Sequence, residues 1–367
     1  MGRQVKICQP TVPTYTLDFF DRLSRSLDCQ LVVYGSEGGL GVLTSKRPKR
    51  PWERALGPIT NILPGVEWQR GALSIPVDSG DIIVVSGGPR CLSNLMLLLK
   101  ARVCGAKTVW WGHYWSSTSR PWRFALRLLL MQLSDVLLLY TDKEMSRYRD
   151  RMGSWQQPVF ALNNGLAADE IQKHRRPYVA AERARSLLFI SRLTTKGEIS
   201  VLLKALANPL LEDVRLEVIG SGEMEWSLRD ESQRLGVQDR ITWHGGMTDE
   251  AEISRIVNHC LLFVYPGAVG LSLIHAMGYG LPAILHGDRL LHGPEADAFD
   301  GGITGLIFKK GDSADLAIKI AQAMSDPLQL EKWSSIALDR FDRDFNTESM
   351  GRRFIEMVAF IKDEVQT

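Results

Sequence analysis

The stretch Tyr265-Pro-Gly-Ala-Val-Gly-Leu-Ser-Leu-Ile-His275-Ala-Met-Gly-Tyr-Gly-Leu-Pro282 predicts a strand that ends in a glycine loop and continues into a helix. The apolar run 261–264 leads into it, and Gly267 and Gly270 loosen the backbone before the helix begins near Leu271. Such a turn points unpaired N–H groups and the positive end of a helix dipole at one spot, which suits a phosphate. A plain strand-to-helix turn of a parallel sheet has the same pattern, so both interpretations stay open at this point.

Short apolar runs alternate with helix-length segments along the chain. The strand-like runs are 5–8, 31–34, 82–86, 108–111, 136–140 and 159–162, then 187–190, 215–219, 241–244, 261–264, 283–285 and 306–308. This alternation is typical of βαβ units with buried parallel strands. We therefore predict an α/β fold made of two doubly wound, Rossmann-like domains that face each other across a cleft. A ligand is expected at the carboxyl ends of the strands.

The chain has 367 residues, more than one hydrophobic core usually serves, which also favours two domains. The polar segment 172–185 is expected to be the linker between them. We predict an N-terminal domain over 1–170 and a C-terminal domain over 171–345. A last helix over 346–367, which Asn346 could cap, is expected to pack back on the N-terminal domain.

Composition is ordinary for a soluble globular protein, with 45% hydrophobic and 23% charged residues. No apolar run is long enough for a membrane span, and the N-terminus has no secretory signal pattern, so a cytoplasmic protein is expected. The five cysteines are scattered and are interpreted as structural thiols, and no metal or cofactor is expected.

Charge is unevenly distributed. Residues 1–168 hold 21 Lys and Arg against 12 Asp and Glu, a net charge of +9, whereas the remainder holds 23 against 30, a net charge of −7. Two segments concentrate the positive charge: the loop Lys46-Arg-Pro-Lys-Arg-Pro-Trp-Glu-Arg54 and the helix that opens with Arg120-Pro-Trp-Arg-Phe. Their composition suits an anionic membrane surface, with a solvated loop and an ordinary core helix as the alternative. Nucleic acid is not expected, because no binding module accompanies the charge.

Three further strand-to-loop turns carry candidate binding residues. Arg192 and Lys196 follow the strand 187–190, two cations placed to pair with a diphosphate. The turns 220–222 and 245–247 add glycines after the next two strands.

The order of these segments in the second domain, from Phe-Ile-Ser-Arg-Leu-Thr-Thr-Lys-Gly through Val-Ile-Gly-Ser-Gly and Ile-Thr-Trp-His-Gly-Gly to the opening stretch, resembles the family-4 retaining glycosyltransferases of the GT-B fold. In the first domain the resemblance is thinner. It is limited to Trp110-Trp-Gly-His113-Tyr and Ala161-Leu-Asn-Asn-Gly165.

The resemblance implies a transferase that uses a nucleotide-sugar donor and a saccharide or lipid-linked acceptor. It implies diphosphate binding by Arg192 and Lys196 and a place for His113 beside the transferred sugar. The remaining donor-binding positions that it implies are Gly246 and Met247 at the base, and Val269, Gly270, Leu271 and Ser272 at the phosphate.

One departure from the family pattern lies in the opening stretch. His275 stands where the family has its second glutamate, and Gly267 stands where it has its first. A neutral imidazole still accepts a hydrogen bond from a ribose hydroxyl, so His275 is predicted to bind the donor. Glu295, in Gly293-Pro-Glu-Ala, is a candidate sugar contact or a helix cap.

Two rivals accompany the transferase hypothesis. A catalytically weakened scaffold with the same fold would follow from the missing glutamate. A dinucleotide-dependent enzyme is disfavoured, because no Gly-x-Gly-x-x-Gly follows the first strand.

Overall fold

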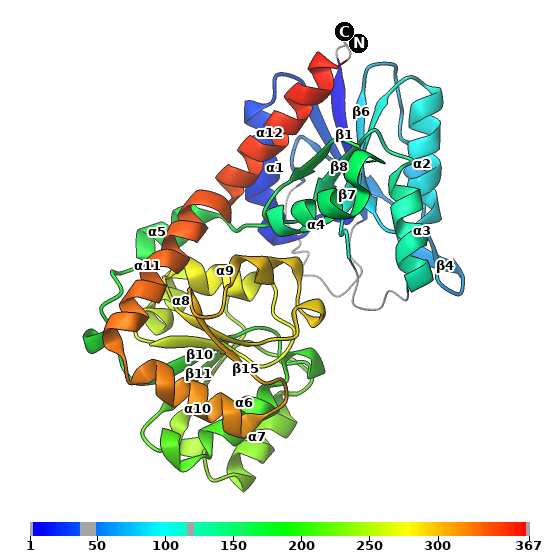
Figure 1. Ribbon diagram of the computed structural model, residues 1–367. Helices are drawn as coiled ribbons and strands as arrows, with labels where there is room; N and C mark the ends of the chain where they lie inside the picture. Colours follow the sequence, from blue (N-terminus) through cyan, green and yellow to red (C-terminus); the bar gives the residue numbers. More distant parts are fainter. Residues whose placement is uncertain (1–2, 37–48, 116–120, 156, 365–367) are drawn as a thin grey trace. The chain divides into compact units, whose positions relative to one another are not determined.

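A computed structural model describes residues 3–36, 49–115, 121–155 and 157–364. The chain forms two compact units, Met1–Asn164 with Thr347–Thr367, and Gly165–Asn346. Both are built on a parallel sheet, which confirms the predicted α/β class with two Rossmann-like sheets (Figure 1). Among the described residues, no helix is both long and apolar enough to cross a bilayer.

The sheet of the first unit has seven strands in the order β3-β2-β1-β6-β7-β8-β9. The strands are β1 (Gln4–Thr11), β2 (Gln30–Ser36), β3 (Glu53–Leu56), β6 (Ile82–Gly87), β7 (Lys107–Gly112), β8 (Val136–Leu139) and β9 (Val159–Ala161). Every pairing is parallel. The chain reverses its direction of travel across the sheet between β1 and β6. That reversal is the topological switch point of the first unit.

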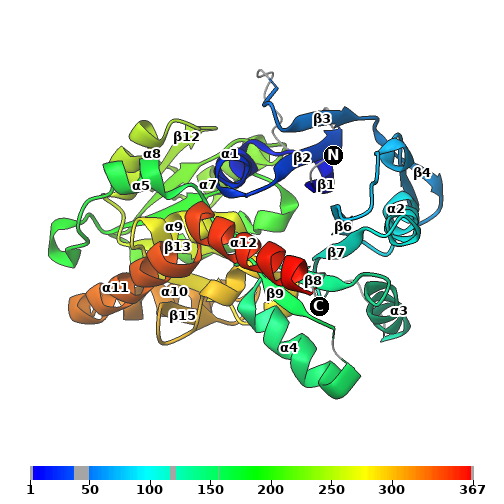
Figure 2. The same cartoon turned by 90° about the horizontal axis from the view of Figure 1, so that it is seen from above.

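Five α-helices belong to the first unit: α1 (Leu17–Ser26), α2 (Leu92–Val103), α3 (Pro121–Met131), α4 (Asp142–Met152) and α12 (Thr347–Asp363). α1 and α12 pack together on one face of the sheet (Figure 2), where the Phe19 and Phe354 rings meet at 6.0 Å. The Arg353 guanidinium contacts both carboxylate oxygens of Asp142, at 2.7 and 3.0 Å. The last helix is therefore anchored by aromatic packing and a two-point ion pair.

The first unit contains two elements that the apolar pattern does not predict: β3 and the antiparallel hairpin β4 (Ile59–Leu63) with β5 (Val66–Gln69). β3 is a four-residue edge strand that begins with Glu53 and Arg54, and β4 is largely exposed, so neither has the apolar run of a buried strand.

The basic loop expected over 46–54 is described only in part, and its tryptophan is not at the surface. Lys46 and Arg47 lie outside the described residues. Trp52 is buried: its ring packs on Phe20 at 5.3 Å, and its indole N–H donates to Asp21 at 2.8 Å. This tryptophan is a core residue and does not touch a lipid surface.

The sheet of the second unit has six strands in the order β12-β11-β10-β13-β14-β15. The strands are β10 (Ser186–Ile190), β11 (Arg215–Ile219), β12 (Ile241–Gly245), β13 (Leu262–Tyr265), β14 (Ala283–His286) and β15 (Gly305–Phe308), and the α-helices are α5 (Ala168–His174), α6 (Ile199–Leu206), α7 (Glu225–Arg234), α8 (Glu250–Val257), α9 (Leu271–Gly278), α10 (Ser313–Met324) and α11 (Pro327–Asp344). Here the switch point lies between β10 and β13.

The segment 172–185, which was predicted to link the two domains, does not lie at the boundary between the units. The boundary between units falls at Asn164, and the segment 172–185 belongs to the second unit, where most of it is at the surface and Ala180 and Arg183 are buried. Arg183 is buried, and its guanidinium donates to the carbonyls of Val257 and Cys260 and lies 4.3 Å from the Tyr178 ring. Even a charged side chain of a polar segment can be buried when backbone carbonyls accept hydrogen bonds from it.

The second unit ends at Asn346, whose side-chain amide donates to the carbonyls of Phe341 and Asp342 at 3.0 and 2.7 Å. These contacts satisfy the last carbonyls of α11, so Asn346 serves the helix that ends before it.

Candidate functional site: a glycine loop at the switch point of the second unit

The turns that follow β10 and β13 meet at the switch point of the second sheet. The Ala268 amide donates to the Lys196 carbonyl at 3.0 Å. A Cβ on Gly267 would lie 2.0 Å from the same carbonyl oxygen, so only glycine permits this approach. The predicted basic turn and the predicted phosphate loop are thus joined through their backbones, at the place where parallel sheets bind ligands.

Arg192 and Lys196 are both exposed on this edge. Lys196 lies in a short 3-10 helix, Thr195–Gly197, and no described carboxylate lies within ion-pair distance of its ammonium. The nearby cation Lys310 pairs with Glu198 at 2.9 Å. Lys196 therefore brings positive charge to the switch point that the described protein groups do not neutralise.

α9 begins at the glycine loop. Gly270 is its N-cap residue with φ −139° and ψ −130°, no described side chain caps it, and no acidic residue stands in its first turn. The amides of Leu271 and Ser272 are first-turn donors without an intrahelical acceptor. Together with the helix dipole they favour an anion at this point.

Two stacked histidines fix the shape of the loop. The Val269 amide donates to His292 Nδ1 at 3.2 Å, and His292 Nε2 lies 3.0 Å from the carbonyl of His286, which requires the Nε2–H tautomer. The two rings stack at 3.9 Å. Burial lowers the pKa of His292 to about 4, so the imidazole is neutral near pH 7 and keeps Nδ1 as an acceptor.

Glu295 lies in a second 3-10 segment, Pro294–Ala298, and is buried. Its Oε2 is 3.5 Å from the position of a Cβ on Gly270 and 2.6 Å from that of a Cβ on Gly293. The carboxylate therefore lies close to the start of α9. There it is within reach of a loop amide or of a sugar hydroxyl bound at this point.

His275 has a carboxylate partner in the second unit. It is the fifth residue of α9, beyond the first turn, and its Nε2 lies 2.7 Å from Glu250 Oε1 at the start of α8. Tyr279 donates to the same oxygen at 2.5 Å. Burial raises the pKa of Glu250, but the hydrogen bonds from His275 and Tyr279 outweigh it, and the pKa lies below its ordinary value.

The ionised Glu250 requires a hydrogen on His275 Nε2, which leaves Nδ1 as the acceptor of a neutral ring. Sequence reasoning missed both Glu250 and His292 as site residues. Glu250 follows Asp249 in a helix start, where acidic residues are common, so nothing in the sequence sets it apart.

The remaining predicted residues are divided between the units. Gly246, which is exposed, and Met247, which packs against the core of the second unit, follow β12 at the carboxyl edge of the same sheet. His113 follows β7 in the first unit, with its ring 4.3 Å from Tyr140 and its Nδ1 3.6 Å from the buried Glu144. Glu144 also accepts from the Tyr140 amide and donates its own amide to Thr141 Oγ1, a capping box that starts α4.

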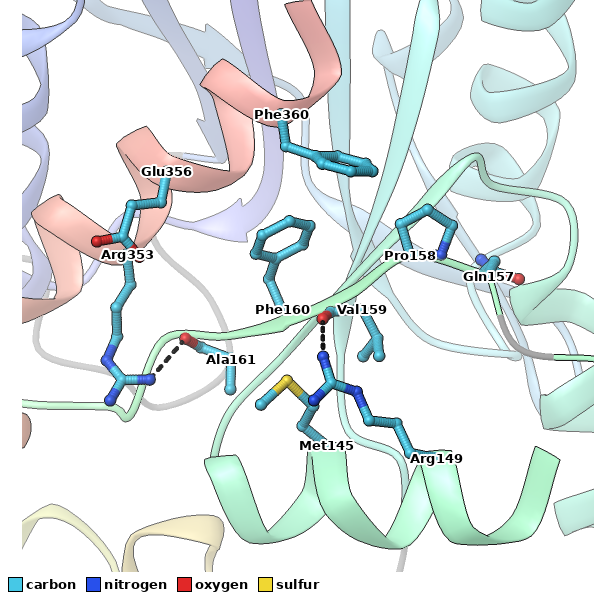
Figure 3. A pocket seen from close by; sticks show the side chains of 10 residues that line it. All are labelled: Met145, Arg149, Gln157, Pro158, Val159, Phe160, Ala161, Arg353, Glu356 and Phe360. Atoms are coloured by element: carbon cyan, nitrogen blue, oxygen red, sulfur yellow. Dashed lines mark hydrogen bonds between the residues drawn. The ribbon is translucent and has the colours of Figure 1, made fainter. Parts of the chain in front are cut away.

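A separate cavity of about 760 Å³ lies in the first unit, between α4, the edge strand β9 and α12 (Figure 3). Arg149 and Arg353 donate to the outward carbonyls of Val159 and Ala161. The arginines that line the cavity thus satisfy carbonyl groups at the open edge of the sheet. None of the predicted site residues lines the cavity.

The fold and the switch-point loop define a two-unit α/β protein with a cationic, glycine-lined turn at the carboxyl edge of its second sheet. Its whole length resembles solved two-domain structures: it aligns with the Anabaena protein HepE, solved in complex with UDP, at a TM-score of 0.68 and 15% identity over 98% of this chain and 100% of that one. Such identity shows a shared fold. The model of the family described as glycosyl transferases group 1 matches residues 170–340, which lie within the second unit.

Two curated relatives each match just under half of the chain. Glycogen synthase of Cellvibrio japonicus is 26% identical over 183 residues, which are 47% of this chain and 37% of that protein. Alpha-monoglucosyldiacylglycerol synthase of Streptococcus pneumoniae is 26% identical over 195 residues, 47% and 43% of the two chains. The chain thus matches less than half of the length of these relatives.

Proposed function

We propose that the protein is a glycosyltransferase that moves a sugar from a nucleoside-diphosphate donor to a saccharide or lipid-linked acceptor, with retention of anomeric configuration. The observation that carries the proposal is the junction of the Lys196 turn with the glycine loop at the switch point. Cations, first-turn amides and a helix dipole there converge on the place where a diphosphate would sit. Each of them stabilises the negative charge that a departing diphosphate develops.

The residue roles are proposed from the resemblance of the motifs. Arg192 and Lys196 hold the diphosphate, Val269, Gly270, Leu271 and Ser272 supply the loop around it, and Gly246 and Met247 border the base. His113 acts at the transferred sugar, and Glu295 contacts it from beside α9. No metal is needed, because these groups supply the positive charge.

The donor is proposed to be a UDP-sugar, since the structural neighbour from Anabaena was solved with UDP. The acceptor is proposed to be an intermediate of cell-surface polysaccharide or glycolipid synthesis. A protein of that kind would work peripherally on the inner face of the cell membrane, with its basic first unit at an anionic membrane surface. The resemblance to the pneumococcal glycolipid synthase supports the lipid alternative.

A screen of thermal stability tests the donor assignment. UDP-, GDP-, ADP- and dTDP-linked sugars are added to the full chain, and the proposal expects selective stabilisation by one nucleotide. A hydrolysis assay with the stabilising donor then separates a transferase from a scaffold of the same fold. Donor binding without turnover on any acceptor would favour the scaffold, which the absent first glutamate makes the second candidate.

His275 is proposed to accept a ribose hydroxyl at Nδ1 while Glu250 holds its other nitrogen. His275→Ala is expected to weaken donor binding about tenfold, the value of one hydrogen bond to a well-placed group. Tyr279→Phe is the matched control, because it removes a second hydrogen bond to Glu250 but leaves the imidazole in place. Equal losses in both variants would show that Glu250, and not the imidazole, is the contact. Isothermal titration with the stabilising nucleotide measures both.

A further inference from the structure

The outer sides of α2 and α3 expose large apolar side chains in regular stripes. The spacing is i, i+4, i+7, i+11 on α2 and i, i+4, i+7 on α3, which places each set on one side of its helix. The seven side chains, called the apolar face below, are Leu92, Met96, Leu99 and Val103 on α2 and Trp122, Leu126 and Leu129 on α3. Val103 is 89% exposed, Leu129 67% and Trp122 59%.

The two helices belong to one layer. α2 connects β6 to β7 and α3 connects β7 to β8, neighbouring strands of the sheet. Successive right-handed crossovers in one direction lie on the same side of a sheet. Their inward side chains join one core cluster, and both views show the helices at the same side of the first unit (Figures 1 and 2). Arg102 at the end of α2 donates to the Leu133 carbonyl after α3 at 3.1 Å, which ties the helix ends together.

Charge on this surface is positive. Neither helix contains an Asp or Glu, whereas four cations lie on them: Lys100, Arg102, Arg123 and Arg127. Lys100 and Arg127 hydrogen-bond to neutral backbone carbonyls, and Arg123 lies 5.1 Å from the Trp122 ring. Asp135 lies 4.0 Å from Arg102 at the edge of the layer. A tryptophan and arginines around exposed aliphatic side chains are the composition of an interfacial, lipid-binding element.

We propose that the apolar face docks the first unit on the surface of a bilayer that contains anionic lipids. The aliphatic side chains and Trp122 enter the boundary between head groups and acyl chains, and Arg102 and Arg123, the exposed cations of the two helices, stay in the head-group layer. A second copy of the chain fits this surface less well, because two faces of the same positive sign would repel each other. The inference rests on the proposed function in one respect: a membrane-bound enzyme is what a lipid-linked acceptor requires.

Vesicle co-sedimentation of the full chain tests the proposal. The wild type is expected to bind phosphatidylcholine vesicles with about one third phosphatidylglycerol at least about tenfold more tightly than pure phosphatidylcholine vesicles, since each cation near an anionic surface adds to binding. The double variant Leu99→Glu with Leu129→Glu removes one large side chain from each stripe and adds two negative charges. It is expected to weaken binding to the anionic vesicles by about 30-fold or more.

Trp226→Glu is the matched control. Trp226 is 79% exposed on α7 of the second unit, a helix that carries Glu225, Asp230 and Glu231. Binding of this variant is expected to stay within about twofold of the wild type, since the three acidic residues of its helix outnumber Arg229 and Arg234 and anionic lipid does not attract a net negative helix. An equal loss in both variants would show a nonspecific effect and overturn the assignment, as would wild-type protein that ignores anionic vesicles.

Two further measurements distinguish a membrane-binding face from a dimer interface and from a failure of the transferase proposal. If sedimentation velocity without lipid shows a dimer that Leu99→Glu with Leu129→Glu converts to a monomer, the face binds a second copy and the proposal is wrong. Stabilisation by the nucleotide-sugar donor is measured on the same samples. A double variant that keeps its donor response but loses vesicle binding supports both proposals, whereas a wild type that binds vesicles but no donor overturns only the transferase.

Discussion

The two switch points of this protein have the same topology and different chemistry. In the second unit, Lys196 and the loop Gly267–Gly270 meet through backbone contacts and leave cations and helix-start amides directed outward. In the first unit, the ends of β1 and β6 are closed by neutral groups. The Gln69 amide donates to the carbonyls of Gln9 and Pro10, and the Trp110 indole fills the space where a Cβ on Gly87 would lie, 2.1 Å away.

The fold determines where a crevice lies, and the side chains determine which ligand the crevice favours. The reversal of strand order fixes where a crevice can form in each sheet. Whether it favours an anion depends on the residues at its rim, and in the second unit the exposed Lys196 and the start of α9 bring positive charge there. The first unit instead places its distinctive charge and apolar surface on the outer side of α2 and α3.

Substitution of Gly267 should have the largest effect. A Cβ there would meet the Lys196 carbonyl at 2.0 Å, so Gly267→Ala must separate the two turns and is expected to destabilise the protein by about 3–5 kcal/mol. Differential scanning calorimetry measures the loss. Gly236→Ala is the control, since Gly236 has φ +70° but no atom within 4 Å of a Cβ, and backbone strain alone should cost about 1 kcal/mol. Equal losses would contradict the close contact.

Removal of the cations should weaken the donor site without unfolding it. Both side chains are exposed, so Arg192→Ala with Lys196→Ala is expected to reduce nucleotide-sugar affinity about 100-fold, from two charge-assisted contacts. Lys204→Ala removes an exposed cation from α6 of the same unit and should leave affinity unchanged. Titration calorimetry distinguishes the variants, and an unchanged affinity in the double variant would move the site elsewhere.

Acid should loosen the loop of the second unit. The pKa of His292 is about 4 in the fold against an ordinary 6.5, so the unfolded chain binds the extra proton between these values. The stabilisation is complete above pH 6.5 and is lost as pH falls toward 4, by up to about 3 kcal/mol. His292→Gln keeps an acceptor for the Val269 amide and cannot titrate. The difference in unfolding free energy between the wild type and this variant should therefore depend on pH in that window.

The smallest effect is expected in the first unit. Gly351 lies inside α12, and a Cβ there meets no atom within 4 Å. Gly351→Ala should therefore stabilise the protein by about 0.5–1 kcal/mol, because alanine favours a helix and loses less entropy on folding. A raised melting temperature would contrast with the loss at Gly267. A lowered one would show that α12 has no room for a methyl group.

The sequence by itself determined the class of fold and the positions of its buried strands along the chain. Buried parallel strands are continuous apolar runs, and such a run is a local property that needs no partner to be visible. β3 and the β4–β5 hairpin escaped prediction because edge and exposed strands lack that run. The cations and glycines of the switch point were visible for the same local reason: they stand directly after predicted strands.

Only the tertiary structure decided which residues meet across the chain. His275 and Glu250 are 25 residues apart and form one hydrogen-bonded pair, and Trp52 is buried whereas Trp122 is exposed, although both follow proline in a basic segment. Arg183 is polar in sequence and buried in the fold. The physical reason is that side-chain burial and partners depend on which elements pack side by side, and that arrangement is set by long-range contacts that no local pattern contains.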